Sequence, residues 1–223
     1  MAPHYVEDLQ QEELTAVAPN IRDVKWSDTK EVLRAGVGRA NHIVSDEYAV
    51  QGTLNFIERY FNDPYYDREQ PQRPVLLKVS LNQPHYPYQT SAEKFNYYLN
   101  RVQPFLDEEV FEHPFLSQRQ VRPGVDASER ELRRAVAAYY GMIETIDDEY
   151  GRIAAALAHV GQNLDDWIVV YTSDHGDMLG SQGETKKQRP WDESIRVPFL
   201  LRWPGRFGRA GRQVDALLDT PDI

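Results

Sequence analysis

The most constraining feature of the sequence is a long amphipathic helix pattern that lies between apolar runs. Ser128 and Glu131 have the form of a capping box, in which each side chain bonds the backbone of the other at a helix start. Apolar residues then recur at alternating spacings of four and three: Leu132, Val136, Tyr139, Ile143, Ile146, Tyr150, Ile153 and Leu157. We therefore predict one helix from Ser128 to about Gly161.

Three short apolar runs predict strands around this helix: residues 75–81 (VLLKVSL), 167–172 (WIVVYT) and 197–203 (VPFLLRW). Because the first two runs are almost continuously apolar, we expect these strands to be buried on both faces, as in a parallel sheet covered by helices. The order of strand, long helix and strand is typical of βαβ units. The sequence therefore predicts an α/β fold with these three strands in one sheet.

Two further stretches complete the predicted outline. Apolar residues at helical spacing predict a helix from Ser45 to Phe61, with Asp46 and Glu47 at its N-terminus. Residues 91–124 carry three prolines and mixed signals, so we expect irregular structure there.

Composition narrows the class of protein. A length of 223 residues suits one domain or a large part of one, and a net charge of −10 disfavours nucleic acid as a partner. The absence of cysteine excludes disulfides, zinc-thiolate sites and a cysteine nucleophile in this sequence. No apolar run approaches a membrane span, and the first residues lack a signal-peptide pattern, so we expect no membrane association and a cytoplasmic location. Oligomeric state is not predicted.

Polar clusters follow two of the predicted strands, where open α/β sheets bind ligands. Asn82 to His85 follows the first strand, and Asp174 with His175 follows the second. A carboxylate and an imidazole side by side can form half of a divalent-metal site, with oxygen ligands favouring calcium, magnesium or manganese. The alternative is that this segment, Ser-Asp-His-Gly-Asp, is a turn chosen for its conformation.

Two other side chains are candidates for the chemistry of a site. His85 can donate a proton or bind an oxyanion, although a solvent-exposed loop histidine is the alternative. Lys187 offers a cation to an anionic substrate, although many loop lysines simply face water. Asp177, Asp192 and Glu193 are interpreted as turn, cap or salt-bridge residues.

In combination these segments resemble a known family. Residues 140–205 contain SDHGDMLG, a lysine loop and WDESIRVP, which resemble the S-D-H/N-G-D-x-L-G turn and the Y-E-E-S-x-R-V-P strand entry of the sulfatases, a branch of the alkaline phosphatase superfamily. The earlier SLNQPHYPYQ, residues 80–89, is similar to the S-x-x-x-P-H-x-P segment of that family. Histidine after the first aspartate resembles the choline-sulfatase and phosphonate monoester hydrolase members.

The resemblance implies a fold and roles for particular residues. It implies an alkaline-phosphatase-like three-layer α/β sandwich with a central, mostly parallel sheet, incomplete at both ends. Asp174 and His175 would ligate a divalent metal, with calcium preferred and manganese or magnesium as alternatives. Lys187 would contact the transferred group or the leaving oxygen, and His85 would bind the oxyanion or act as general acid. Gln182 stands where the family often has histidine.

The resemblance also implies an activity and a missing part. It implies metal-dependent hydrolysis of small anionic sulfate esters, with phosphate or phosphonate ester hydrolysis or a non-catalytic pseudoenzyme as alternatives. The nucleophile of the family is a formylglycine made from C/S-x-P/A-x-R, and no such segment occurs here. We therefore expect residues 1–223 to be an interior part of a sulfatase catalytic domain, inactive alone, with the formylglycine in a segment upstream.

Overall fold

A computed structural model describes residues 29–63, 74–105, 127–188, 190–216 and 218–219. It contains both helices and strands, which confirms the α/β class at that level. The elements in chain order are α2 (Thr29–Leu33), β1 (Gly36–Val37), α3 (Asn41–Phe61), β2 (Gln89–Thr90), α4 (Ala92–Leu99), α5 (Glu129–His159), η2 (Leu164–Asp166), β3 (Val169–Thr172), η3 (Ser181–Gly183), α6 (Asp192–Ile195), β4 (Phe199–Arg202) and α7 (Pro204–Phe207).

Helix α5 is the long helix that the capping box predicted. The Ser128 hydroxyl accepts from the Glu131 backbone N–H, and the Ser128 N–H donates to the Glu131 carboxylate at 2.7 Å. The helix contacts α2, α3, α4, β1 and β2, so it organises most of the packing. Its apolar stripe is not fully covered, since Ile143 and Tyr150 remain 39% and 42% exposed.

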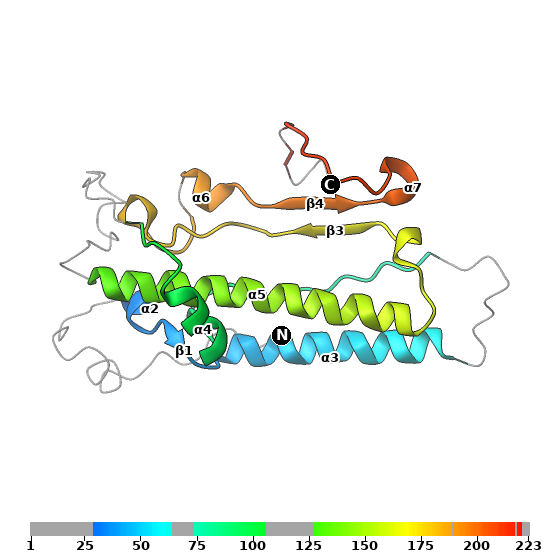
Figure 1. Ribbon diagram of the computed structural model, residues 1–223, viewed down its shortest axis with the longest axis horizontal. Coiled ribbons are helices and arrows are strands. Elements are labelled where there is room, and N and C mark those ends of the chain that lie inside the picture. Colours follow the sequence, from blue (N-terminus) through cyan, green and yellow to red (C-terminus); the bar gives the residue numbers. More distant parts are fainter. Residues whose placement is uncertain (1–28, 64–73, 106–126, 189, 217, 220–223) are drawn as a thin grey trace.

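Two hydrophobic cores lie along α5. The larger joins α5 to α2, α4 and the segment before β2, through residues such as Val32, Tyr88, Phe95 and Met142. The smaller joins the C-terminal ends of α3 and α5, and its buried members are Ile57, Phe61, Leu157 and Val160. Helices α3 and α5 therefore lie side by side (Figure 1).

Helix α3 confirms the predicted helix but begins at Asn41 rather than Ser45. The interpretation of Asp46 as an N-terminal residue was wrong, because Asp46 lies inside the helix and is only 2% exposed. Its carboxylate instead accepts from the backbone N–H groups of Asn82 and Gln83, at 2.7 and 2.8 Å. A buried carboxylate needs such donors, and the neighbouring segment supplies them.

Part of the predicted irregular region is helical. Residues 92–99 form α4, whose N-cap Ser91 accepts from the Lys94 backbone N–H at 3.3 Å. Phe95 on this helix packs into the larger core, which outweighs the mixed local signals of the sequence. Residues 106–126 lie outside the described part of the chain.

The predicted strands do not share one sheet among the described residues. Strands β3 and β4 pair antiparallel, with Val169 opposite Arg202 and Thr172 opposite Phe199, and β1 pairs with β2 in parallel. Residues 75–81 are extended but form no assigned strand. The strand pairings in the described ranges therefore do not confirm a central parallel sheet.

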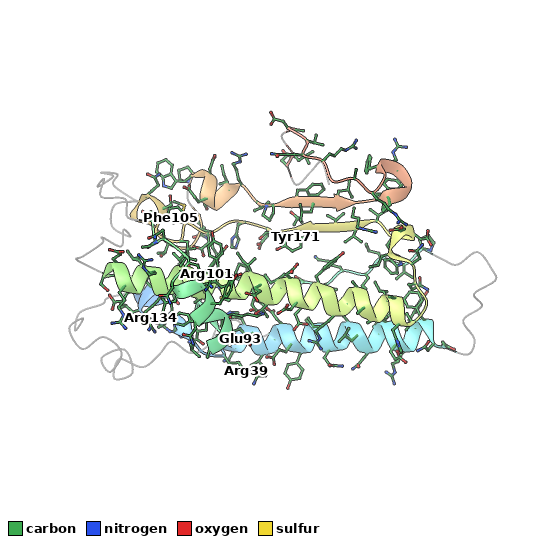
Figure 2. The ribbon with its side chains drawn as sticks, viewed as in Figure 1. Arg39, Glu93, Arg101, Phe105, Arg134 and Tyr171 are labelled. Carbon is green, nitrogen blue, oxygen red and sulfur yellow. The ribbon has the colours of Figure 1, made fainter. Side chains whose placement is uncertain are left out.

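The prediction of strands buried on both faces was wrong for the described structure. Leu76 is 95% exposed, and in β3 Val170 and Tyr171 are 46% and 37% exposed. Tyr171 lies on the α5 side of β3 (Figure 2). The helices do not cover these faces, because β3 and β4 form a layer whose packing with α5 is slight (Figure 1). None of the described helices combines the length and apolar character needed to cross a membrane.

Candidate functional site

The loop that carries His85 is held at its start and by hydrogen bonds within it. The Asp46 carboxylate bonds its first residues, and the His85 backbone N–H donates to the Asn82 carbonyl at 2.9 Å. The His85 imidazole Nδ1 lies 2.7 Å from the Tyr86 carbonyl oxygen. These contacts fix the ring at the end of the extended segment 74–82.

His85 and Lys187 are in direct contact, although they are far apart in the sequence. The distance from His85 Nε2 to Lys187 Nζ is 2.7 Å. The Tyr86 carbonyl can only accept, so Nδ1 carries the proton and Nε2 accepts from the Lys187 ammonium. Burial lowers the pKa of His85, and the charge of Lys187 lowers it further. The pair is therefore a neutral imidazole beside a cation.

Two ammonium groups lie over one aromatic ring. Lys186 Nζ and Lys187 Nζ are 4.5 and 5.0 Å from the centroid of the Tyr86 ring. Burial lowers the pKa of Lys187, whereas the carboxylates of Asp177 and Asp174 raise it. The site thus concentrates positive charge next to His85, as an anion-binding site requires.

Asp174 and His175 form a turn directly after β3. The Ser173 hydroxyl donates to the His175 carbonyl at 2.8 Å, and His175 Nδ1 lies 2.8 Å from the Gly176 carbonyl. His175 Nε2 faces Asp174 Oδ1 at 3.7 Å, and the Asp174 side chain is 86% exposed. A histidine whose Nδ1 bonds a carbonyl presents Nε2 to a metal, so this pair fits as two ligands of one ion.

The four predicted residues lie in one region. His85 and Lys187 are in contact, and His175 and Asp174 lie close enough to interact electrostatically with this pair. Within the described ranges, no group of three or more histidine, aspartate or glutamate side chains is arranged to hold a metal. The described residues therefore bring a carboxylate and two imidazoles near the Lys187 ammonium.

Asp177 makes more contacts than its interpretation as a turn, cap or salt-bridge residue suggests. Its carboxylate accepts from the Tyr88 hydroxyl at 2.8 and 3.0 Å and from the backbone N–H groups of Leu179 and Lys186 at 2.9 and 3.1 Å. Burial raises the pKa of Asp177 to about 6, and these hydrogen bonds oppose that shift. The second aspartate of the SDHGD motif is the feature of the sequence that could have pointed to these contacts.

Gly176 connects this turn to the segment around α6. A β-carbon on Gly176 would lie 2.0 Å from the Glu193 carbonyl oxygen, so only glycine fits. Its N–H donates to the Ser194 carbonyl at 2.9 Å. Asp192 pairs with Arg196 at 3.1 Å, which agrees with its interpretation as a salt-bridge residue, whereas Glu193 accepts from the Ser181 hydroxyl at 2.6 Å.

His42 was missed in the sequence. It lies in the first turn of α3, and its ring centroid is 6.5 Å from that of His85 in an edge-to-face arrangement. Burial lowers the pKa of His42 to about 4, and Asp46 opposes that shift. A lone histidine outside the recognised motifs offered no signal, so only the packing of α3 against the His85 loop identifies it.

Comparison with known proteins identifies the family. The family model described as Sulfatase matches residues 8–223. This chain belongs to the sulfatase family. The resemblance inferred from SDHGDMLG and PHYP is thereby confirmed, including its place in the alkaline phosphatase superfamily.

Several of the similar proteins are named sulfatases. An arylsulfatase of Clostridium perfringens is 34% identical over 164 residues, which cover 70% of this chain and 34% of the relative. The choline-sulfatase of Rhizobium meliloti is 30% identical over 144 residues, 61% of this chain and 28% of that protein. This sulfatase chain therefore spans about a third of the length of such relatives.

A solved structure supports the fold assignment. The phosphonate monoester hydrolase of Agrobacterium radiobacter aligns with a TM-score of 0.59 and 28% identity, covering 73% of this chain and 34% of that protein. The similarity supports an α/β fold of the alkaline phosphatase type for the sulfatase chain.

Proposed function

We propose that this chain is part of a sulfatase catalytic domain, and that the complete domain hydrolyses small anionic sulfate monoesters. The observation that carries the proposal is the 2.7 Å contact between His85 Nε2 and Lys187 Nζ, beside the pair Asp174 and His175, in a member of the sulfatase family. The exposed apolar faces around β3 support an alkaline-phosphatase-like three-layer sandwich whose central, mostly parallel sheet is completed by further chain.

Lys187 and His85 would bind the ester and supply the proton for its leaving oxygen. An ammonium carries three N–H donors, so Lys187 can contact an oxygen of the bound ester while it donates to His85 Nε2. The cation stabilises negative charge that develops on the leaving oxygen. The proton for that oxygen would come from this pair, since Lys187 is the protonated partner and His85 is neutral.

Asp174 and His175 would hold a divalent metal ion, with calcium preferred and manganese or magnesium as alternatives. The support is the chemistry of the donors: a carboxylate and an imidazole Nε2 that face each other, with Nδ1 engaged by a carbonyl. When bound, such an ion polarises an oxygen of the sulfate group.

We further propose that the chain alone does not turn over esters. The formylglycine nucleophile would come from a segment outside these residues, and covalent transfer cannot start without it. We propose a cytoplasmic location and no nucleic-acid or membrane partner, in line with the net charge of −10.

The proposal is tested by the binding of inorganic sulfate to the purified chain, monitored by NMR of isotope-labelled histidine. Sulfate is expected to shift the His85 signals with a dissociation constant in the millimolar range. Lys187→Ala is expected to weaken binding at least about tenfold, whereas Lys186→Ala serves as the matched control, with an effect below about threefold. Equal effects of both variants, or no sulfate-dependent shift, would overturn the proposed anion site.

Phosphate or phosphonate ester hydrolysis is the second candidate, favoured by the similarity to the phosphonate monoester hydrolase. Phosphate and sulfate monoesters differ by one charge near neutral pH, so the same titration with phosphate and methylphosphonate ranks the alternatives. The remaining alternative is a non-catalytic role, which sequencing of the genomic DNA upstream of Met1 tests. This DNA is expected to encode C/S-x-P/A-x-R in frame. Its absence would favour a pseudoenzyme.

A further inference from the structure

Asp177 lies where the three segments of the candidate site meet. Tyr88 belongs to the segment that carries His85, and its hydroxyl donates to both carboxylate oxygens of Asp177, at 3.0 and 2.8 Å. Leu179 follows the Asp174 turn, and its backbone N–H donates to Asp177 Oδ1. Lys186 directly precedes Lys187, and its N–H donates to the same oxygen. One carboxylate thus contacts all three segments.

The two backbone donors have an unfavourable conformation. Leu179 and Lys186 have φ angles of 47° and 68°, in the left-handed region that residues with a β-carbon adopt at a cost. Both N–H groups point to Asp177 Oδ1, at 2.9 and 3.1 Å. Such backbone persists where surrounding contacts over-determine it, and it clusters at functional sites. Asp177 is therefore part of what holds the lysine loop in shape.

Asp177 also acts on the charge of the site. Among the groups that raise the pKa of Lys187 against its burial, Asp177 has the largest effect and Asp174 the next. The hydrogen-bond partner of Asp177 is itself anchored, because the Tyr88 side chain is 0% exposed and lies in the larger core. The core thus fixes the position of the Asp177 carboxylate, and this carboxylate fixes the position of the lysine loop.

We propose that Asp177 is a positioning residue of this site. It sets where the Lys187 ammonium lies relative to His85, through the Leu179 and Lys186 backbone and through its own negative charge. The inference deepens the proposed function, since it rests on Lys187 and His85 forming the anion-binding pair. Asp177 acts on that pair and does not itself contact the ester.

The test compares Asp177→Asn with Tyr88→Phe in the whole chain. Both variants disturb the hydrogen bonds between Tyr88 and Asp177, so both are expected to lower the melting temperature. Only Asp177→Asn removes the carboxylate from Lys186 and Lys187. NMR of isotope-labelled histidine, with His85→Gln to assign the signals, reports the tautomer and the titration midpoint of His85.

In the unaltered chain and in Tyr88→Phe, His85 is expected to be the Nδ1–H tautomer with Nε2 as acceptor. In Asp177→Asn we expect the same tautomer, because the Tyr86 carbonyl still accepts from Nδ1, but a shifted Nε2 signal and a higher titration midpoint, because Lys187 is no longer held at Nε2. An unchanged His85 in Asp177→Asn, with only a lower melting temperature, would reduce Asp177 to a purely structural role and overturn the proposal.

A second variant covers the case in which Asp177→Asn does not fold. Adding Lys186→Gly relieves the left-handed strain, because glycine adopts positive φ freely. Lys186→Gly alone is the reference, because it removes the Lys186 charge from both proteins. If Asp177 merely offsets strain, the double variant shows the His85 signals of Lys186→Gly; if Asp177 positions Lys187, its signals differ from those of Lys186→Gly. The His85 signals report where Lys187 lies whether or not an ester is hydrolysed. If these signals do not respond to the loss of Asp177, only the positioning role is contradicted. A failure of sulfate binding in the unaltered chain contradicts the proposed function.

Discussion

At the scale of residues, the site combines groups whose charge is suppressed by burial with groups that carry charge. His42 and His85 both have lowered pKa values, chiefly because of burial, while Lys187 donates as an ammonium to one of them. A neutral imidazole can accept from a lysine, whereas a protonated one would repel it. The packing of α3 against the His85 loop thus favours the protonation state on which the lysine contact depends.

His42 leads to a pH prediction. Its pKa is about 4 in the folded chain and about 6.5 when unfolded, so the folded state disfavours the protonated form. The stability that follows from this difference is complete above the unfolded value and is lost as the pH falls from about 6.5 towards 4. Between about pH 7.5 and pH 5 the unaltered chain is expected to lose about 1–2 kcal/mol more than His42→Leu, after allowance for partial exposure.

Urea unfolding at both pH values measures this difference. Because His85 is present in both proteins, its own titration largely cancels in the comparison. Parallel losses of unfolding free energy in the two proteins would show that His42 is not held neutral by the fold.

At the scale of elements, short contacts between segments determine where the strand ends meet. Asp46 on α3 fixes the start of the His85 loop, and Gly176 lets the turn after β3 approach the segment around α6. Periodicity in the sequence located α5 and α3, because one-sided burial leaves a regular apolar pattern. It could not locate these contacts, since a carboxylate that bonds a distant backbone and a glycine in close contact leave no periodic trace.

Gly176→Ala is expected to be strongly destabilising. The new β-carbon would overlap the Glu193 carbonyl oxygen, 2.0 Å away, so the turn and α6 must separate. We expect a loss of at least about 2 kcal/mol and a melting temperature lower by about 4–8 °C.

Gly151→Ala provides the matched control. Gly151 lies within α5, and a β-carbon there meets nothing within 4 Å. This change is expected to stabilise the chain by about 0.5–1 kcal/mol, because alanine favours helix over glycine. Thermal unfolding of both variants measures the contrast, and a Gly176→Ala variant as stable as the unaltered chain would contradict the described packing of the turn.

At the scale of the whole molecule, the helical side is well packed and the strand side is not. The SDHGDMLG, lysine-loop and PHYP segments were enough to predict the family and the residues that meet at the site, because these segments carry the chemistry. The order of strand, long helix and strand predicted the α/β class. The strand predictions were less successful: residues 75–81 form no assigned strand, and β3 and β4 pair antiparallel. Apolar runs indicate burial, but among the described residues β3 and β4 pair only with each other, so their apolar faces stay partly exposed.

The exposed strand faces predict self-association of the isolated chain. Leu200 on β4 is 63% exposed, and exposed apolar sheet faces promote pairing with other molecules. Sedimentation is expected to show concentration-dependent oligomers that Leu200→Lys reduces, with a change in stability below about 0.5 kcal/mol. Val214→Lys is the control, because Val214 is 67% exposed but lies outside the sheet. A strictly monomeric chain at all concentrations would contradict this prediction.

The anchoring of Tyr88 in the larger core has a consequence for the order of assembly. That core forms from α2, α4 and α5, all within the residues described. The imidazole and the lysine loop can therefore come together as soon as these helices pack. If further chain completes the domain as proposed, it would meet His85 and Lys187 already in contact.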